Sequence, residues 1–452
     1  MQDSKNRVKI EVSNQITITG LPLKYEESVK KSLTFANRDF FKMQKMGIRT
    51  PSEYKYWKAS KDGSLIIPRG CLMRLKAFLE KVGESCQWQV DLVSIPAIFP
   101  PRTGDLRAFQ SEIVDKVVNG KCTEGLIVAS TGSGKSLVAL EIIQRLALSS
   151  TIIVPNTVLL EQFKGECEKF FNFTPSLIDA DHKEIGKLTI ATWQSLGSND
   201  ALLARLVANT SVLIIEEAHG VVSTERKRTL KEFKPSYLMG ITATPERSDA
   251  LGPAIEFLLG KPLAQYEATQ CTPTVEVIRT NVDIGMHYEY NKIIDAMVEN
   301  KSRTKLLAGI VLGELLQGRK ILVLTKRIKM YENVREILPE MDGVYFIDSK
   351  DPERDELLKG FKDGSFEYKA IFGTISLLGT GFDLPSADTL ILAGDVKSSV
   401  LTVQICGRVL RLFKGKPTPK IIDFADMSNI ILRRQFYERK KVYESKRWPI
   451  KI

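Results

Sequence analysis

The sequence lacks the features that would place the protein in a membrane or in an oxidising compartment. It has no apolar run of about 18 residues and no basic-then-apolar leader after Met1, so we expect neither a membrane span nor a secretory signal. Its six cysteines are scattered without a C-x-x-C pair, and only three histidines accompany them. This pattern argues against zinc sites, iron–sulfur clusters and disulfides. We therefore expect a cytoplasmic protein with no membrane partner and no structural metal.

Acidic residues are scarce at the two ends of the chain. Residues 1–100 carry 17 Lys and Arg against 10 Asp and Glu, and residues 413–452 carry 11 against 4, within an overall charge of +11. Basic ends around a near-neutral middle favour a polyanionic partner such as a nucleic acid, although a solvated basic face gives the same balance. A chain of 452 residues also exceeds what one core supports, which predicts several domains.

Two stretches alternate short apolar runs with longer amphipathic segments. The first includes GLIVAS, TIIVP and VLIIEE, and the second includes KILVLT, YKAIFGT and TLILAG. Such alternation predicts parallel sheets with helices on both faces. We therefore expect an α/β fold with parallel-sheet domains at residues 101–270 and 271–430, a small basic α+β accessory domain at residues 1–100, and a basic C-terminal tail at residues 431–452.

A glycine-rich turn lies between a strand-like and a helix-like segment in LIVASTGSGKSLVAL. This is the order that a phosphate-binding loop requires, in which Lys135 reaches the β- and γ-phosphates and Ser136 binds Mg²⁺. Ala129 stands where the strict pattern has glycine, and a chance glycine-rich turn is the alternative. The loop residues that we expect to bind a nucleotide are Thr131, Gly132, Ser133, Gly134, Lys135 and Ser136.

Two adjacent carboxylates end an apolar run in LIIEEAHG. A phosphoryl-transfer site needs one carboxylate for the metal and another group to orient water, and both are expected at such a strand end. We expect Glu216 to hold Mg²⁺ and Glu217 to activate the attacking water. An exposed strand end with a solvated His219 is the alternative.

These segments, with others in a fixed order, resemble the superfamily 2 helicases and translocases, whose motor is a pair of RecA-like domains with ATP between them. The resemblance covers roughly residues 101–425. The matching segments are LRAFQ, ASTGSGKS, VPNTVLLEQF, ATWQSL, EEAH, TATP, ILVLTKR, GTISLLGTGFDLP and QICGRVLR. Within the superfamily, TATPERSD followed by GKPLAQYEATQ is most like the phage branch-migration helicases of the UvsW kind.

The resemblance implies a role for each matching residue. Arg107 and Gln110 match the adenine-recognising element, and Gly381 and Asp383 match a nucleotide-sensing turn. The residues implied in catalysis with Glu217 are Gln404, Arg408 and Arg411; those implied in coupling are His219, Thr242 and Thr244; those implied in DNA contacts are Thr192, Thr325 and Thr374.

Two of these assignments carry a physical argument. Arg408 and Arg411 lie three residues apart, which would place both on one helical face and aim both at the same phosphates. Glu216 departs from the family, because most members have Asp there, and its extra methylene shifts a carboxylate around a geometrically strict ion. We still expect activity, since Lys135 and Glu217 are present.

The resemblance implies a DNA-stimulated ATP hydrolase that uses ATP and Mg²⁺. We expect a helicase that acts on branched DNA, such as forks, Holliday junctions and D-loops, in phage recombination, repair or replication. A duplex translocase that does not separate strands and a nucleotide-gated nucleic-acid clamp are the alternatives. Basic and aromatic residues mix near YKYWK and could stack bases at a junction, or the aromatics could form the core of a small domain.

Overall fold

The computed structural model of the protein describes most of the chain. The described residues are 8–45, 47, 49–120, 122–130, 133–243, 252–266, 271–280, 289–348, 350–378, 384–394, 396–413 and 415–452. They divide between two compact units, within residues 1–267 and 268–452. No described helix is long and apolar enough to cross a bilayer.

The described residues between 8 and 90 form a small mixed sheet with helices, here called the N-terminal module. Its sheet has the order β5-β6-β2-β1-β7, in which only the β1–β7 pair is parallel. Every second side chain of β1 is buried, as a half-buried strand requires. The elements are β1 (Val8–Val12), β2 (Gln15–Thr19), α1 (Leu23–Ser32), β3 (Thr34–Ala36), α2 (Phe40–Lys45), β4 (Glu53–Lys55), β5 (Lys58–Ala59), β6 (Leu65–Pro68), η1 (Arg69–Cys71), α3 (Leu72–Val82) and β7 (Cys86–Val90).

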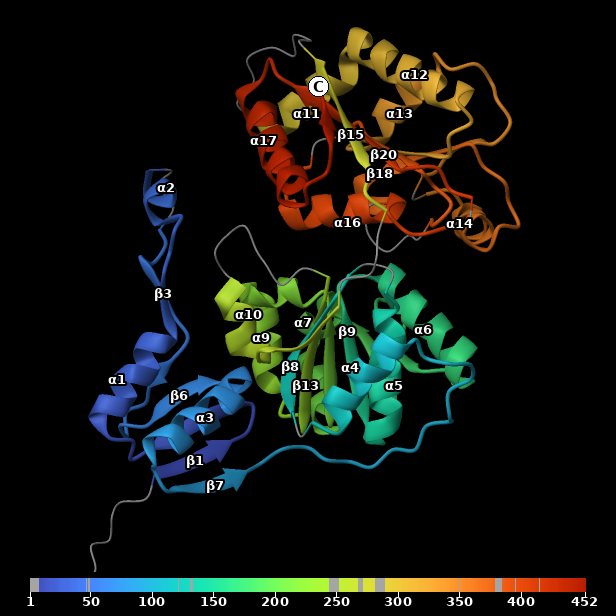
Figure 1. Ribbon diagram of the computed structural model, residues 1–452. Coiled ribbons are helices and arrows are strands. Elements are labelled where there is room, and N and C mark those ends of the chain that lie inside the picture. Colours follow the sequence, from blue (N-terminus) through green and yellow to red (C-terminus); the bar gives the residue numbers. More distant parts are fainter. Residues whose placement is uncertain are drawn as a thin grey trace, which may run out of the picture. The chain divides into compact units, whose positions relative to one another are not determined.

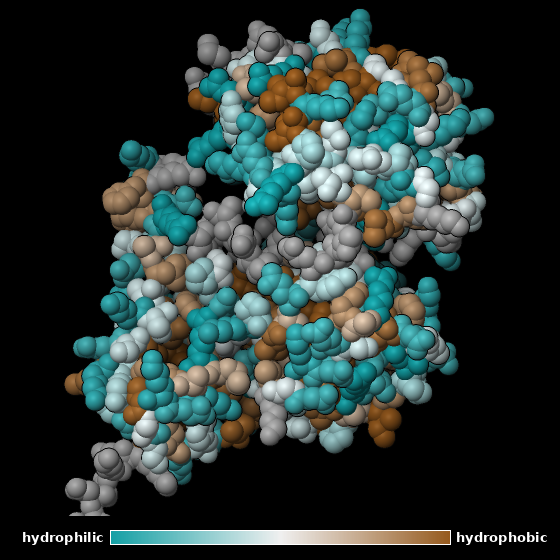
Figure 2. Space-filling view, viewed as in Figure 1, coloured by the Kyte–Doolittle hydropathy of each residue, from teal (hydrophilic) through white to brown (hydrophobic). Residues whose placement is uncertain are grey.

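The first parallel-sheet domain follows, with seven strands in the order β10-β11-β9-β12-β13-β8-β14. Its central strands are buried along their whole length, because helices cover both faces of the sheet. Figure 1 shows helices on both sides of this sheet, and Figure 2 shows hydrophilic side chains over the outer surface of α5 and α6. The elements are α4 (Ala108–Val118), β8 (Glu124–Ala129), α5 (Lys135–Leu146), β9 (Ser150–Val154), α6 (Thr157–Phe171), β10 (Ser176–Ile178), β11 (Leu188–Thr192), α7 (Trp193–Gly197), α8 (Asp200–Ala208), β12 (Val212–Glu216), η2 (Ala218–Val222), α9 (Thr224–Glu232), β13 (Tyr237–Thr242), α10 (Gly252–Leu259) and β14 (Pro262–Tyr266).

The second parallel-sheet domain also has seven strands, in the order β17-β18-β16-β19-β20-β15-β21, and two apolar clusters cover its faces. The expected pair of RecA-like parallel-sheet domains after a small α+β region is therefore confirmed. The elements are β15 (Thr274–Thr280), α11 (Tyr290–Glu299), α12 (Lys301–Leu316), β16 (Ile321–Thr325), α13 (Ile328–Arg335), β17 (Val344–Phe346), α14 (Arg354–Asp363), β18 (Ala370–Thr374), α15 (Ile375–Leu378), β19 (Thr389–Leu392), α16 (Ser399–Val409), β20 (Lys420–Asp426), α17 (Ile430–Ser445) and β21 (Ile450–Lys451).

The segment expected as a basic C-terminal tail is part of the second parallel-sheet domain. Helix α17 packs Phe436 and Tyr443 into the core, and β21 pairs with β15. The buried Arg439 guanidinium donates to both carboxylate oxygens of Asp423, at 2.8 to 3.1 Å. Net charge identified this segment as basic, but it does not show which cations have buried partners.

The N-terminal module belongs to the same compact unit as the first parallel-sheet domain. Arg69 of η1 forms a buried ion pair with Glu124 of β8, with an N–O distance of 2.9 Å. The thiol of Cys71 donates to the carbonyl oxygen of Phe257 in α10. The expected boundary at residue 100 thus separates two sheets that share buried contacts.

Candidate active site

The phosphate-loop segment joins β8 to the first residue of α5. Gly134 ends the loop with a φ of 79°, a left-handed conformation that glycine adopts without strain. A Cβ at this position would lie 2.5 Å from Nε2 of Gln110. That amide donates to the carbonyl oxygen of Ser133 at 2.9 Å, and its Oε1 accepts from the backbone N–H of Arg107. Gln110 is thus placed against the loop, whereas the side chain of Arg107 is exposed.

Three side chains at the start of α5 are suited to phosphates and metal. Lys135 Nζ lies 3.4 Å from the carbonyl oxygen of Ser130, and Ser136 is buried. The hydroxyl oxygen of Ser133 is buried and has no hydrogen-bond partner among the described residues. A buried hydroxyl without a partner is costly, so this atom is available to an incoming oxygen ligand.

Two polar residues of α6 also belong to the site, although the motif comparison did not single them out. Gln162 Nε2 donates to Ser136 Oγ at 3.3 Å and to Glu166 Oε1 at 3.1 Å. Their spacing of four residues is the signal that could have found them, because it places both on the side of α6 that also carries the buried Phe163.

The two adjacent carboxylates are separated by an unusual backbone turn. Glu216 ends β12 and is 5% exposed, whereas Glu217 has a φ of 51° and begins the short helix η2. The left-handed conformation costs a non-glycine residue about 1–3 kcal/mol, and such strain is often found at functional sites. The Glu217 carboxylate remains partly exposed, and its Oε2 lies 3.1 Å from Nδ1 of His219. The turn thus gives neighbouring acids different environments.

Burial raises the pKa of the Glu216 carboxyl to about 8. Lys135 opposes this shift, whereas the charges of Glu217 and Glu166 add to it. Oε2 of Glu216 is buried and has no hydrogen-bond partner among the described residues. A buried carboxylate among other acids requires a nearby cation to remain ionised.

These residues fit Mg²⁺. The ion prefers oxygen ligands and is usually held by one or two protein oxygens together with phosphate and water, which the Ser136 hydroxyl and the unpartnered Glu216 oxygen can supply. Among the described residues there is no cluster of three or more His, Cys, Asp or Glu side chains that could hold a metal ion, and a Mg²⁺–nucleotide site does not require one.

The candidate catalytic residues of the second compact unit lie on and after α16. Gln404 and Arg408 are buried on the helix. The helix ends at Val409, so Arg411 lies beyond it, and the expectation that both arginines share one helical face is wrong. Burial lowers the pKa of Arg411 to about 10, which leaves it charged at neutral pH.

The threonines assigned to DNA contacts end three strands. Thr192 is buried and caps α7 by accepting from the backbone N–H of Ser195. Thr325 is buried and donates to the carbonyl oxygen of Arg327. Thr374 is partly exposed and, with Lys326 and Arg327, lines a pocket of about 780 Å³ in the second unit.

The remaining expected residues are placed only in part. Thr242 is fully buried at the end of β13. Outside the described residues lie Thr131, Gly132, Thr244, Gly381 and Asp383.

The aromatic residues of the N-terminal module mostly pack within it. The Phe35 ring stacks on Tyr56 with centroids 5.8 Å apart, and Trp57 donates its indole N–H to Thr34 Oγ1. Phe41 and Trp88 are more exposed, at 73% and 38%.

Comparisons with known proteins agree with this arrangement. The family model "Type III restriction enzyme, res subunit" matches residues 103–247, and "Helicase conserved C-terminal domain" matches residues 302–413. The protein "Putative helicase 161L" of Invertebrate iridescent virus 6 is 27% identical over 77% of this chain and 83% of its own length. "DNA 3'-5' translocase XPB2" of Sulfurisphaera tokodaii is 27% identical over 74% of this chain and 85% of its own.

Matches to two solved structures differ in strength. A fragment of a "putative HsdR subunit of a type I restriction enzyme" from Vibrio vulnificus YJ016 has a TM-score of 0.55 and 19% identity, and the match covers 90% of this chain and 80% of that one. The crystal structure of T4 UvsW matches over 98% of both chains with a TM-score of 0.42 and 14% identity.

The two family models follow the order of the two parallel-sheet domains, and together they span more than half of the residues. The first covers the phosphate loop and both acids of EEAH, and the second covers α16 and Arg411. With its pair of RecA-like domains, the chain belongs to the superfamily 2 helicases and translocases, which are motors that hydrolyse ATP.

Proposed function

We propose that this chain is a DNA-stimulated, Mg²⁺-dependent ATPase that acts as a helicase on forks, Holliday junctions and D-loops in phage recombination, repair or replication. The proposed ATPase activity rests mainly on the buried Glu216 carboxylate, because its unpartnered oxygen lies in the same site as Lys135 and Ser136. Support for branched DNA comes from the basic N-terminal module, which is joined to the first parallel-sheet domain by the buried pair of Arg69 and Glu124.

Each residue of the site has a separate proposed task. The Lys135 ammonium binds the β- and γ-phosphates, and Ser136 and Glu216 hold Mg²⁺. Bound Mg²⁺ neutralises charge that develops on the phosphate oxygens. Glu217 accepts a proton from the attacking water, and His219, 3.1 Å away, couples the state of that carboxylate to movement.

The second compact unit is proposed to supply the remaining charge. Gln404, Arg408 and Arg411 contact the γ-phosphate region, where a guanidinium stabilises the charge of the transition state. Residues Thr192, Thr325 and Thr374 mark strand ends that we propose to lie along a DNA backbone. For Thr192 and Thr325, neighbouring backbone amides are the better donors, since both hydroxyls are buried and already paired.

A duplex translocase that does not separate strands is the second candidate. It is favoured by the match to the restriction-enzyme family model and by the relative named as a DNA translocase. A nucleotide-gated clamp, which binds without turnover, would follow if Glu216 prevented hydrolysis.

The experiment is an ATPase assay without DNA and with single strands, blunt duplex, forks and Holliday junctions, together with strand separation on the labelled fork. The proposal expects hydrolysis to rise most with branched DNA and the fork to be unwound. Equal stimulation by blunt duplex without unwinding would establish the translocase, and nucleotide binding without hydrolysis on any DNA would establish the clamp. Lys135→Ala should lose hydrolysis in every case, and retained turnover would refute the phosphate-loop assignment.

A further inference from the structure

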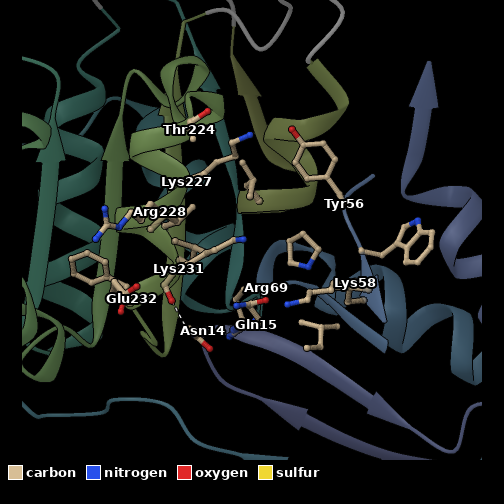
Figure 3. A pocket seen from close by; sticks show the side chains of 18 of the residues that line it. Asn14, Gln15, Tyr56, Lys58, Arg69, Thr224, Lys227, Arg228, Lys231 and Glu232 are labelled. Atoms are coloured by element: carbon tan, nitrogen blue, oxygen red, sulfur yellow. Dashed lines mark hydrogen bonds between the residues drawn. The ribbon is translucent and has the colours of Figure 1, made fainter. Parts of the chain in front are cut away.

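A pocket of about 520 Å³ lies inside the first compact unit, between the N-terminal module and helix α9 of the first parallel-sheet domain. Its walls come from β2, β6 and the β4–β5 segment on one side and from α9 on the other (Figure 3). The volume falls within the range of about 300–1,000 Å³ that is usual for small-ligand sites. None of the residues assigned above to ATP hydrolysis lines it, and neither do Thr192, Thr325 and Thr374, whereas the YKYWK segment at residues 54–58 does.

The lining is strongly basic. Figure 3 shows Lys227 of α9 extending toward Tyr56, and Lys231 of α9 extending toward the side of the pocket that carries Lys58 of β5 and Arg69. Six lining residues are Lys or Arg and one, Glu232, is acidic. No ion pair joins the three lysines to a carboxylate in the described part of the chain, so their charges are uncompensated by the protein.

Two of these lysines repel each other at the pocket wall. Burial lowers the pKa of Lys227, and the charge of Lys231 lowers it further. The ammonium of Lys227 also lies 5.8 Å from the centroid of the Tyr56 ring, which stacks on Phe35. An anion between the two amines would relieve this repulsion, so the wall is better suited to an occupied pocket than to an empty one.

Arg69 provides an independent sign of a missing partner. Its side chain is 3% exposed, and its Nη1 donates to Glu124 Oε2 at 2.9 Å. Its Nε and Nη2 are buried and have no hydrogen-bond partner among the described residues. Each buried donor without a partner costs about 1–3 kcal/mol, and a planar guanidinium with two free donors matches two oxygens of one phosphate.

We propose that this pocket binds a phosphate group of a DNA strand and forms a second DNA site, shared by the N-terminal module and α9. The assignment rests on the proposed function, since it takes DNA as the polyanion. The amines of Lys58, Lys227 and Lys231 neutralise the phosphate, and Arg69 fixes its orientation. Since one wall belongs to the N-terminal module and the other to α9 of the first parallel-sheet domain, an occupied pocket would hold the module in place while the motor works on another part of a branched molecule.

The experiment compares fork binding by the full-length protein and by Lys227→Ala/Lys231→Ala, measured by fluorescence anisotropy without ATP at several salt concentrations. Loss of one neutralised phosphate lowers the slope of log K against log salt by about 0.7–0.9. We expect that change and at least a tenfold weaker affinity at low salt. The matched control is Lys31→Ala/Lys81→Ala, which removes two exposed lysines of the N-terminal module outside the pocket and should change affinity less than twofold.

The outcomes are distinguishable from failure of the proposed function. Because binding is measured without ATP, the absence of ATPase activity would refute the proposed helicase function but would not affect this binding test. If both double variants bind forks with the same slope and affinity, the pocket proposal is overturned. If inorganic phosphate alone raises the melting temperature of the wild type but not of Lys227→Ala/Lys231→Ala, while fork binding is equal, the pocket takes free phosphate and not DNA. Should the double variant unfold, Lys58→Ala on the exposed β5 gives the same readout.

Discussion

Glu216 and Glu217 show how one backbone conformation assigns different chemistry to neighbouring residues of one type. The φ of 51° at Glu217 ends β12 abruptly, so that Glu216 stays buried while Glu217 reaches a partly exposed position beside His219. A straight strand would instead alternate the two side chains between the faces of the sheet. The strain of the turn is therefore best explained by the position that it gives to each carboxylate.

Substitutions of Glu216 and Glu217 should affect ATP hydrolysis in different ways. Glu217→Gln keeps size and hydrogen bonding but removes the base, so turnover should fall by about 10²–10⁴-fold while Mg²⁺–ATP still binds. Glu216→Gln should raise the Mg²⁺ concentration that gives half-maximal activity, whereas Glu216→Asp should remain active. The measurement is ATPase rate against Mg²⁺, with nucleotide binding measured alongside. If Glu217→Gln hydrolyses ATP at the wild-type rate, Glu217 is not the base. If Glu216→Gln has an unchanged Mg²⁺ requirement, Glu216 does not hold the metal.

Glu216 should also make the nucleotide-free protein less stable at high pH. Its pKa is about 8 in the folded protein and lies near 4.5 in an unfolded chain. The folded state therefore binds the proton more tightly, and this contribution to stability is present at pH 4 and is lost as the pH rises from 4.5 through 8. Glu216→Gln cannot ionise, so its melting temperature should exceed that of the wild type at pH 8.5 and approach it at pH 5.

The size of this difference has a natural limit and a control. The shift of the Glu216 pKa from 4.5 to about 8, at about 1.4 kcal/mol per pKa unit, sets an upper limit of about 5 kcal/mol on the advantage of Glu216→Gln at pH 8.5. Saturating Mg²⁺–ATP should reduce or reverse the advantage, because the ion stabilises the ionised carboxylate. Melting curves that differ by the same amount at pH 5 and pH 8.5 would show that Glu216 does not titrate in this range.

Sequence patterns located most elements but not the ends that matter for the site. The alternation of apolar runs predicted both parallel sheets, because strands buried on both faces, such as β12, read as continuous apolar segments. It could not show that α16 ends at Val409, since Leu410 and Arg411 have ordinary helical propensity. Nor could it show that Thr192 and Thr325 are buried, because a hydroxyl at a strand end suits a cap and a phosphate contact equally well.

Helix α6 shows the opposite case, in which a helix that begins inside a matched segment carries more of the site than the motif suggested. Gln162 and Glu166 are joined at 3.1 Å, and Gln162 also reaches Ser136. The matched segment VPNTVLLEQF ends at Phe163, so it includes Gln162 but not Glu166. The polar pair is visible in the sequence as an i, i+4 spacing, but its target on α5 depends on the packing of two helices.

For the molecule as a whole, the N-terminal module and the first parallel-sheet domain behave as one compact unit. Glu124 of β8 is 1% exposed, and its two oxygens accept hydrogen bonds from Arg69 and from the backbone N–H of Met73. Removal of the module would leave this carboxylate and the buried face of α10 uncovered. A truncated protein therefore tests more than DNA binding, which is why the pocket is better examined by point substitutions.

The shared core predicts that a stability effect at Glu124 depends on the presence of the module. In the full-length protein, Glu124→Gln should cost about 3–5 kcal/mol, because it leaves the buried Arg69 guanidinium without a compensating charge. In a protein that starts at residue 101, the same substitution should have almost no effect, since Arg69 is absent and position 124 faces water. The truncated protein should also melt at a lower temperature than the full-length chain without any DNA present. The measurement is thermal unfolding of four proteins: the full-length and the truncated chain, each with and without Glu124→Gln. If Glu124→Gln lowers stability by the same amount with and without residues 1–100, the module is tethered to the motor without sharing its core.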